Sequence, residues 1–163
     1  MPEGIETDGS QNLADCEALA VRVRAALVAA GLVVRIPEVP DPLGHGAGVD
    51  VEVDIDEGPG VFVTWLGSPR LQDRSRRAYR FADYEDPTFK FNYAVGQAML
   101  VAMKTILAAA GFGVRDNDDE YHVDSLIVLA APDKPLYWGL YPEETALEAW
   151  KKNTAGSSGA AEA

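Results

Sequence analysis

The stretch that decides the fold of this chain is residues 49–66, with the sequence VDVEVDIDEGPGVFVTWL. Valine or isoleucine alternates with aspartate or glutamate over its first eight residues, which places apolar side chains on one face of a strand and carboxylates on the other. Glu57-Gly-Pro-Gly60 then predicts a turn, and residues 61–66 are mostly β-branched or aromatic, as strands favour. The stretch therefore predicts an antiparallel hairpin with one buried face.

The first predicted helix lies on the N-terminal side of this hairpin. Apolar residues recur at intervals of three and four over residues 13–30, as on the buried face of an amphipathic helix. Ser10 or Asn12 is expected to cap its start, which leaves residues 1–11 as a disordered N-terminus. Gly31 is expected to end the helix in a left-handed conformation.

Two segments connect this helix to the hairpin. Residues 32–36 predict a short strand that ends before Pro37, because proline cannot donate a hydrogen bond to a neighbouring strand. Residues 37–48 are rich in proline and glycine and predict a loop. A loop of this length in a compact domain is typical of either a mobile segment or a contact with a partner.

Two cap signals predict two consecutive helices after the hairpin. Ser68-Pro69 and Asp86-Pro87 each combine an N-cap residue with a first-turn proline. They predict a short helix over residues 69–81 and the longest helix of the chain from residue 87 to about residue 110. The expected buried face of the long helix consists of apolar residues at helical spacing: Val95, Ala98, Met99, Ala102, Met103, Ile106, Leu107 and Ala110.

The C-terminal part of the sequence predicts a second hairpin. Its strands are expected over residues 112–115 and 121–130, with an acidic turn between them. Residues 107–115 also match residues 27–35 at six of nine positions. This match has two explanations: a duplicated helix-to-strand module, or two independent uses of the same helix ending.

These elements together predict the α+β class. We expect a mainly antiparallel sheet of about five strands with helices packed on one face, in the order αβββααββα. A short helix over residues 143–151 completes this order. The expected single domain covers residues 12–152, and residues 153–163 are expected to form a disordered C-terminal tail.

The composition is typical of a globular protein from a reducing compartment. The chain has 163 residues and a net charge of −12, which disfavours the binding of polyanions by the body as a whole. The single cysteine, Cys16, lies among the apolar residues of the first predicted helix and is expected to pack rather than to react. No apolar run approaches the roughly eighteen residues of a membrane helix, and no secretory signal is recognisable. We expect a cytoplasmic protein.

One short segment departs from this acidic character. Five of the fourteen cationic residues fall between residues 70 and 80, close to aromatic side chains. Arginine binds carboxylates and phosphates through a planar guanidinium, so this segment is the best candidate for a binding surface. The candidate partner-binding residues are these arginines and two aromatic neighbours: Arg70, Arg74, Arg76, Arg77, Arg80, Trp65 and Tyr84.

The sequence leaves three uses of these arginines open. They can neutralise the protein's own carboxylates, either along residues 49–56 or at Asp83, Glu85 and Asp86. They can bind a protein partner, or they can bind nucleic acid or a phosphate-containing ligand. The negative charge of the other residues would repel a polyanion, which favours a protein partner over nucleic acid.

Signals of catalysis and of metal binding are weak. Acidic clusters at residues 50–57 and 116–120 offer oxygen ligands, but neither has the glycine and glutamate spacing of an EF-hand loop. His45 and His122 have no partners at a spacing typical of a zinc site or a catalytic triad. We expect no catalytic residue, no metal site, no cofactor and no enzymatic activity, with a metal-dependent hydrolase as the least favoured alternative.

The predicted order of elements over about residues 12–152 is similar to that of the type III secretion chaperone-like fold. This resemblance implies a small acidic protein that dimerises and binds segments of partner proteins. The additional helix over residues 69–81 departs from that order. The bias toward Ala, Gly, Val, Arg and Asp, with few lysines, also resembles that of actinobacterial proteins from high-GC genomes.

The function that we expect from the sequence is therefore protein interaction without catalysis. We expect a chaperone-like or adaptor-like domain that forms a dimer with itself or binds a protein partner. The contact would be made through the arginine-rich helix predicted over residues 69–81 or through a face of the sheet. The alternative is binding of nucleic acid or of a phosphate-containing ligand through residues 70–80.

Overall fold

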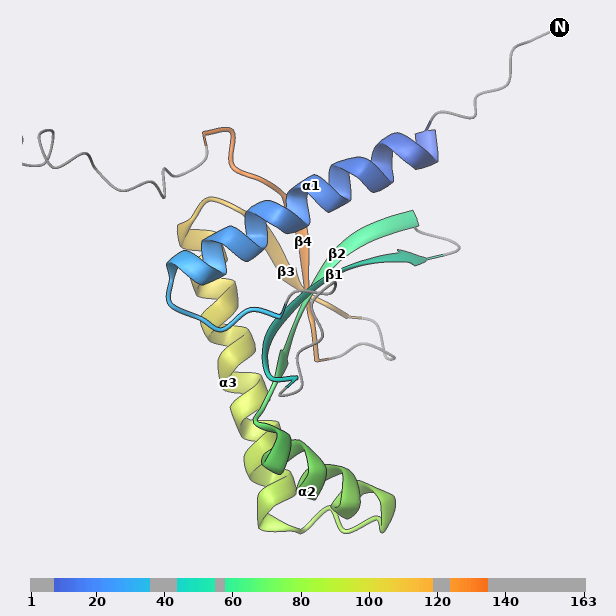
Figure 1. Cartoon of the computed structure of the whole chain (residues 1–163), viewed down its shortest axis with the longest axis vertical. Helices are drawn as coiled ribbons and strands as arrows, with labels where there is room; N and C mark the ends of the chain where they lie inside the picture. The colour runs from blue at the N-terminus through green and yellow to red at the C-terminus, as the bar shows by residue number, and fades with distance from the viewer. Residues whose placement is uncertain (1–7, 36–43, 55–57, 119–123, 135–163) are drawn as a thin grey trace, which may run out of the picture.

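The computed structural model describes residues 8–35, 44–54, 58–118 and 124–134. Two of the predicted segments, the helix over residues 143–151 and the tail over residues 153–163, lie outside this part of the chain. Figure 1 shows the helices and strands that the described residues form, which are α1 (Asp8–Ala29), β1 (Gly46–Asp54), β2 (Gly58–Leu66), α2 (Pro69–Arg80), α3 (Pro87–Ala109), β3 (Gly113–Asp116) and β4 (Leu126–Ala130).

The strands form one antiparallel sheet with the order β1-β2-β4-β3. The predicted hairpin of residues 49–66 is present as β1 and β2, with Val49 opposite Val63. The second predicted hairpin is present as β3 and β4, although β4 begins only at Leu126: residues 124–125 precede the strand, and residues 121–123 lie outside the described residues. Strand β4 also pairs with β2, so that Val61 lies opposite Val128. This confirms the α+β class and the antiparallel sheet, although the described sheet has four strands where about five were predicted.

The predicted strand over residues 32–36 is the one that the described sheet lacks. Only a single parallel bridge links Val34 to Ala47. Two backbone hydrogen bonds form this bridge. The N–H of Arg35 donates to the carbonyl oxygen of Ala47 at 2.8 Å, and the N–H of Ala47 donates to the carbonyl oxygen of Val33 at 2.9 Å. The segment therefore borders β1 without extending the ladder.

The prediction that the loop continues to residue 48 is also wrong, because β1 begins at Gly46. The side chain of Arg35 crosses this end of β1, and a Cβ atom at Gly48 would overlap its guanidinium. The same guanidinium donates a hydrogen bond to Oγ1 of Thr64 on β2, at 3.3 Å. Gly48 is thus a strand residue, and the close approach of the Arg35 guanidinium explains why it is glycine.

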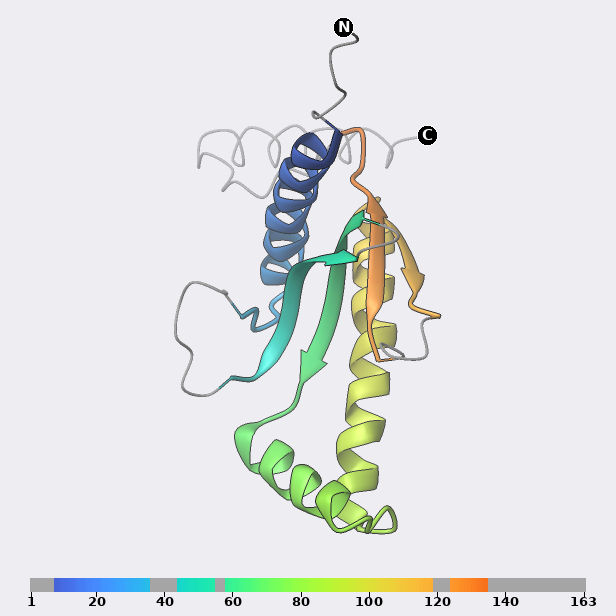
Figure 2. The same ribbon diagram turned by 90° about the vertical axis from the view of Figure 1, so that its right-hand side faces the viewer.

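The core lies on one face of the sheet, between the strands and the helices α1 and α3 (Figure 2). The expected alternation along β1 is present only in part: Val49 is fully buried and Asp50 is more exposed, but Val53, which was expected on the buried face, is 65% exposed near the end of the strand. The largest buried side chains come from both helices and from the central strands: Val23, Leu27, Met103, Leu107, Val49, Val61, Val63 and Leu126. No helix in the described part of the chain is long and apolar enough to cross a membrane.

The buried face of α3 differs by one position from the prediction. Met103, Leu107 and Ala110 are buried as expected, but Ala98 is exposed and Leu100 takes its place in the core. Burying the larger side chain removes more apolar area from water, which explains why the helix is turned toward Leu100.

Helix α1 begins at Asp8, before either of the predicted caps. Asn12 therefore lies inside the helix, which also includes residues 8–11 of the stretch that was expected to precede it. Residues 8–12 are polar but contain no proline, so they can continue the helical hydrogen bonding toward the N-terminus.

The only cysteine, Cys16, packs on the edge of the core as predicted. It is half-buried, and its Sγ lies 3.5 Å from the carbonyl oxygen of Pro59. Burial raises the pKa of this thiol, and the charge of Asp15 raises it further. Both effects disfavour the reactive thiolate.

Helices α1 and α3 end in the same way, at Gly31 and Gly111. Both glycines are left-handed, with φ of 87° and 89°, as the sequence predicted. The residue after each glycine donates a backbone hydrogen bond five residues back, from Leu32 to Leu27 and, at the end of α3, from residue 112 to residue 107. This is the Schellman arrangement, and it explains the repeated sequence through local helix-end chemistry.

We expect alanine to destabilise the protein at both glycines, and more at Gly111 than at Gly31. Gly31→Ala should cost about 1–2 kcal/mol, because an L-residue is strained in a left-handed conformation. Gly111→Ala has the same strain and also brings Cβ to 2.9 Å from Cβ of Pro132, whereas nothing lies within 4 Å at position 31. Urea unfolding measures both losses. Equal stability of the two variants would contradict the close approach of Pro132.

Candidate binding groove

Helix α2 begins directly after β2 and lies beyond the end of the sheet, against α3 (Figure 2). The connection uses Gly67, where a Cβ atom would lie 2.9 Å from Oδ1 of Asn92. The hydroxyl of Ser68 accepts the backbone N–H of Leu71 at 3.4 Å, which confirms the predicted N-cap. Local sequence therefore determines where α2 starts and which way it leaves the sheet.

The contact between α2 and α3 is narrow and partly polar. The buried residues of α2 are Ser75 and Ala78, so the helix turns only a thin stripe of small side chains toward its neighbour. Nδ2 of Asn92 donates a hydrogen bond to Oγ of Ser75 at 3.2 Å, and Nε2 of Gln72 donates one to the carbonyl oxygen of Gly67 at 2.6 Å. These contacts place α2 without burying the larger side chains around it.

Asp86 links the start of α3 to α2, the helix that carries the arginine cluster. Its Oδ1 accepts the backbone N–H groups of Thr88 and Phe89 at 2.8 and 3.2 Å, and its Oδ2 accepts Nη2 of Arg74 at 2.8 Å. Only 6% of the side chain is exposed. Burial raises the pKa of Asp86, but the hydrogen bonds from Phe89 and Thr88, together with Arg74, outweigh it and lower the pKa below its ordinary value.

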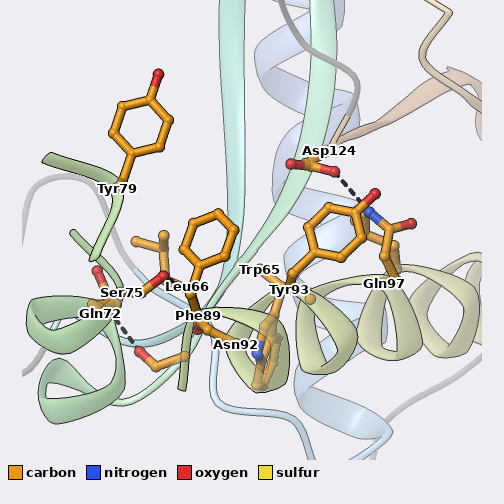
Figure 3. A pocket seen from close by; sticks show the side chains of 13 residues that line it. Trp65, Leu66, Gln72, Ser75, Tyr79, Phe89, Asn92, Tyr93, Gln97 and Asp124 are labelled. Carbon is orange, nitrogen blue, oxygen red and sulfur yellow. Dashed lines mark hydrogen bonds between the residues drawn. The ribbon is translucent and has the colours of Figure 1, made fainter. Parts of the chain in front are cut away.

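A groove runs between α2 and α3 and reaches the end of β2 (Figure 3). Its deep part has a volume of about 320 Å³ and its wider outer part about 610 Å³. The two parts share several lining residues, so they form one continuous hollow: Leu66, Gln72, Ser75, Tyr79, Phe89 and Asn92.

Aromatic side chains form much of the groove wall. Trp65, Tyr79, Phe89 and Tyr93 line the deep part, and Tyr79 is 66% exposed. Tyr84 stands edge-on between two of them, with ring centroids 6.1 Å from Tyr79 and 5.8 Å from Phe89. The groove thus offers apolar and ring surfaces that solvent can reach.

Polar groups are spaced along the same wall. Nε2 of Gln97 donates to Oδ1 of Asp124 at 2.7 Å, at the deep end of the groove (Figure 3). Nε1 of Trp65 is buried and has no hydrogen-bond partner among the described residues. A buried donor without a partner is costly, so this N–H lowers the stability of the described part of the chain.

Gly96 is the most informative residue of the groove. It lies in the interior of α3, where glycine costs about 1 kcal/mol of helix stability relative to alanine. Its backbone conformation does not require glycine, and a Cβ atom there would meet none of the described residues within 4 Å. Packing among the described residues therefore gives no reason for glycine at this position, and glycine adds no side chain to the deep part of the groove that it lines.

The structure divides the predicted arginine cluster into paired and unpaired members. Arg74 pairs with Asp86 at 2.8 Å, and Arg77 pairs with Asp73 at 3.2 Å. The other members, Arg70, Arg76 and Arg80, have no carboxylate within 4 Å among the described residues. Asp86 thus neutralises one arginine of the cluster, Arg74, whereas Glu85 pairs with Lys90 and not with an arginine.

The predicted binding residues do not all meet at one place. Arg76 and Arg80 line the outer part of the groove, and Trp65 lines the deep part. Arg70 is exposed at the first turn of α2, away from the lining residues. Because α2 packs on α3, its arginines form no ion pair with the described carboxylates of β1, Asp50 and Glu52 included.

The groove residues that α3 contributes carry little local signal in the sequence. Asn92, Tyr93 and Gln97 are polar or aromatic residues of a helix, and such residues are ordinary on any helix surface. Asp124 comes from the turn before β4, which no local pattern connects to α3. Gly96 carried the available signal, as a glycine inside an otherwise strong helix pattern.

The acidic clusters and histidines do not converge on this groove. Asp116 pairs with Lys104 at 2.6 Å, and Asp118 lies 3.8 Å from Arg115. Within the described residues no three metal-ligating side chains come together. His45 is half-buried at the start of β1, and His122 lies outside the described residues.

Comparisons with protein-family models, curated proteins and solved structures found no match to this chain. The groove is therefore interpreted from its own geometry and chemistry. Its features are an open deep part at Gly96, aromatic walls and two arginines at the outer end.

We expect Asp86→Asn to lower stability in a pH-dependent way. Because the folded-state pKa of Asp86 lies below its ordinary value of 3.8, the carboxylate stabilises the fold above that pH, and this stabilisation is lost as the pH falls through the folded-state pKa. The variant should be less stable than the parent at pH 7 and approach it below about pH 4. Urea unfolding at a series of pH values measures the difference.

Asp83→Asn is the matched control, because Asp83 is exposed and its side chain forms no ion pair among the described residues. It should change stability little at pH 7. A loss of stability in Asp86→Asn that is the same at every pH would show that the charge of Asp86 is not the cause.

Proposed function

We propose that this protein is a non-enzymatic interaction domain that binds a segment of a partner protein in the groove between α2 and α3. The observation that supports this most directly is Gly96, a costly glycine that faces the open part of the groove and that packing does not require. Proteins keep such locally unfavourable residues where function needs the space.

The chemistry of the groove suits a polypeptide. Side-chain amides of Gln72, Asn92 and Gln97 line it, and amides can both donate to and accept from a peptide backbone. Between these polar groups, the aromatic rings can accommodate apolar side chains, which is the usual composition of a recognition groove.

The resemblance to type III secretion chaperone-like proteins points in the same direction, because it implies the binding of partner segments. It also implies dimerisation, so a second copy of the chain is a competing occupant of the groove. The experiment below is designed to separate these two occupants.

The test is a selection of peptides from a random displayed library on the immobilised protein, followed by titration of synthetic copies. Trp138→Phe with Trp150→Phe leaves Trp65 as the sole indole, so its fluorescence reports occupation of the deep part. Bound peptides should shift this fluorescence, because they change the surroundings of the ring.

Gly96→Leu should abolish peptide binding while leaving the fold intact, because the new side chain extends into the groove. Gly96→Ala should raise the free energy of unfolding by about 1 kcal/mol. Ala98→Leu adds the same side chain at an exposed position of the same helix that does not line the groove, and it should bind peptides as the parent does.

Two results would overturn the proposal. One is the absence of any selected peptide whose binding Gly96→Leu removes. The other is a dimer, detected by light scattering, that Gly96→Leu converts to a monomer, since the groove would then serve self-association.

A further inference from the structure

The two parts of the groove differ in charge. The outer part is lined by Arg76 and Arg80, and none of the described residues that line it is acidic. The deep part is lined mainly by uncharged residues, and its acidic group is Asp124, which already accepts a hydrogen bond from Gln97. A segment lying along the groove would therefore meet positive charge at one end and apolar surface with amides at the other.

The two outer arginines lack the partners that such groups normally find. Arg76 donates to the neutral Oε1 of Gln72 at 3.1 Å, and Arg80 has no ion pair among the described residues. Carboxylates outnumber cationic side chains by 26 to 14 in this chain, so acidic partners are plentiful. Arginines that remain without one at the mouth of a groove are available to a ligand carboxylate.

The strongly negative net charge does not prevent this. At physiological ionic strength, charges more than about 8 Å apart are largely screened, so the potential inside the groove depends mainly on the charges nearest to it. Among the described lining residues of the outer part these are Arg76 and Arg80, while Asp73 on the same helix is paired with Arg77. A short acidic segment can lie against these two arginines. A nucleic acid strand extends further and meets more of the acidic body, including the exposed Asp83 and Glu85 that follow α2.

Apolar anchoring is available next to the arginines. Tyr79 and Phe89 line both parts of the groove, so their rings offer apolar surface to a side chain in either part. An aromatic or aliphatic side chain at this point would lie one or two residues from a carboxylate on Arg76 or Arg80.

We propose that the groove recognises an acidic segment in which aspartate or glutamate stands next to an aromatic or aliphatic anchor. The anchor enters the deep part beside Gly96, and the carboxylate binds Arg76 and Arg80. This inference rests on the proposed function and adds the chemistry of the partner to it.

The test compares two baits in the same peptide selection. Arg76→Glu with Arg80→Glu reverses the charge of the outer part, and Arg115→Glu with Lys134→Glu is a control with the same change in net charge at exposed positions that do not line the groove. The parent and the control should enrich peptides with an acidic residue beside an apolar anchor. The reversed bait should enrich basic residues at that position.

Synthetic peptides then give the magnitude. A fluorescein-labelled acidic peptide from the selection should bind about tenfold or more weakly to the reversed protein, and an analogue with glutamine for glutamate should lose a similar factor on the parent. A twelve-nucleotide single-stranded oligonucleotide should bind the parent more weakly than the acidic peptide at 0.15 M salt.

Different outcomes separate the two proposals. Neutral or basic peptides whose binding Gly96→Leu removes would overturn the acidic preference and leave the groove as a binding site. Tighter binding of the oligonucleotide, with a steep salt dependence, would assign the arginines to nucleic acid instead. The absence of any groove-dependent peptide would overturn both proposals.

Discussion

The rest of the structure depends on the pairing of β2 with β4. Each hairpin pairs strands that are neighbours in sequence, whereas these two strands are joined through only three residue pairs, from Val61–Val128 to Val63–Leu126. The pairing combines two hairpins into one sheet whose apolar face is wide enough for both α1 and α3. Because β4 lies between β2 and β3, these two strands are not neighbours in the sheet. The chain that connects them leaves the end of β2, forms α2 beyond the sheet and returns along α3 (Figure 2).

The groove follows from what α2 lacks. A helix with a broad apolar stripe would pack closely on its neighbour and exclude solvent, but α2 buries only Ser75 and Ala78. Its position is set instead by individual polar contacts, such as Asn92 to Ser75 and Arg74 to Asp86. The aromatic side chains near this contact are consequently left with surfaces that no described residue covers, and they line the hollow between the helices.

Features set by a few neighbouring residues could be predicted from the sequence. The caps at Ser68 and Asp86 and the left-handed glycine Gly31 depend on local hydrogen bonds, and the structure shows them where the sequence placed them. The order of the strands could not be predicted, because it depends on contacts between distant segments. The groove is a similar case: Trp65 and Asp124 line it together, but no spacing in the sequence relates them. Residues 46–48 predict a loop because two of the three are glycine, and the crossing of Arg35 that makes glycine suitable for the strand at position 48 cannot be seen in the sequence.

That crossing has a consequence for how this chain can vary. The guanidinium of Arg35 occupies the place on β1 where a side chain of residue 48 would lie. The segment before β1 therefore covers the strand at a position where the strand has no side chain of its own. Positions 35 and 48 should therefore covary among related sequences, with a larger residue at 48 accompanied by a shorter one at 35. The same overlap fixes the alignment of this segment against β1, because a shift by one residue would bring the guanidinium against a position that has a side chain.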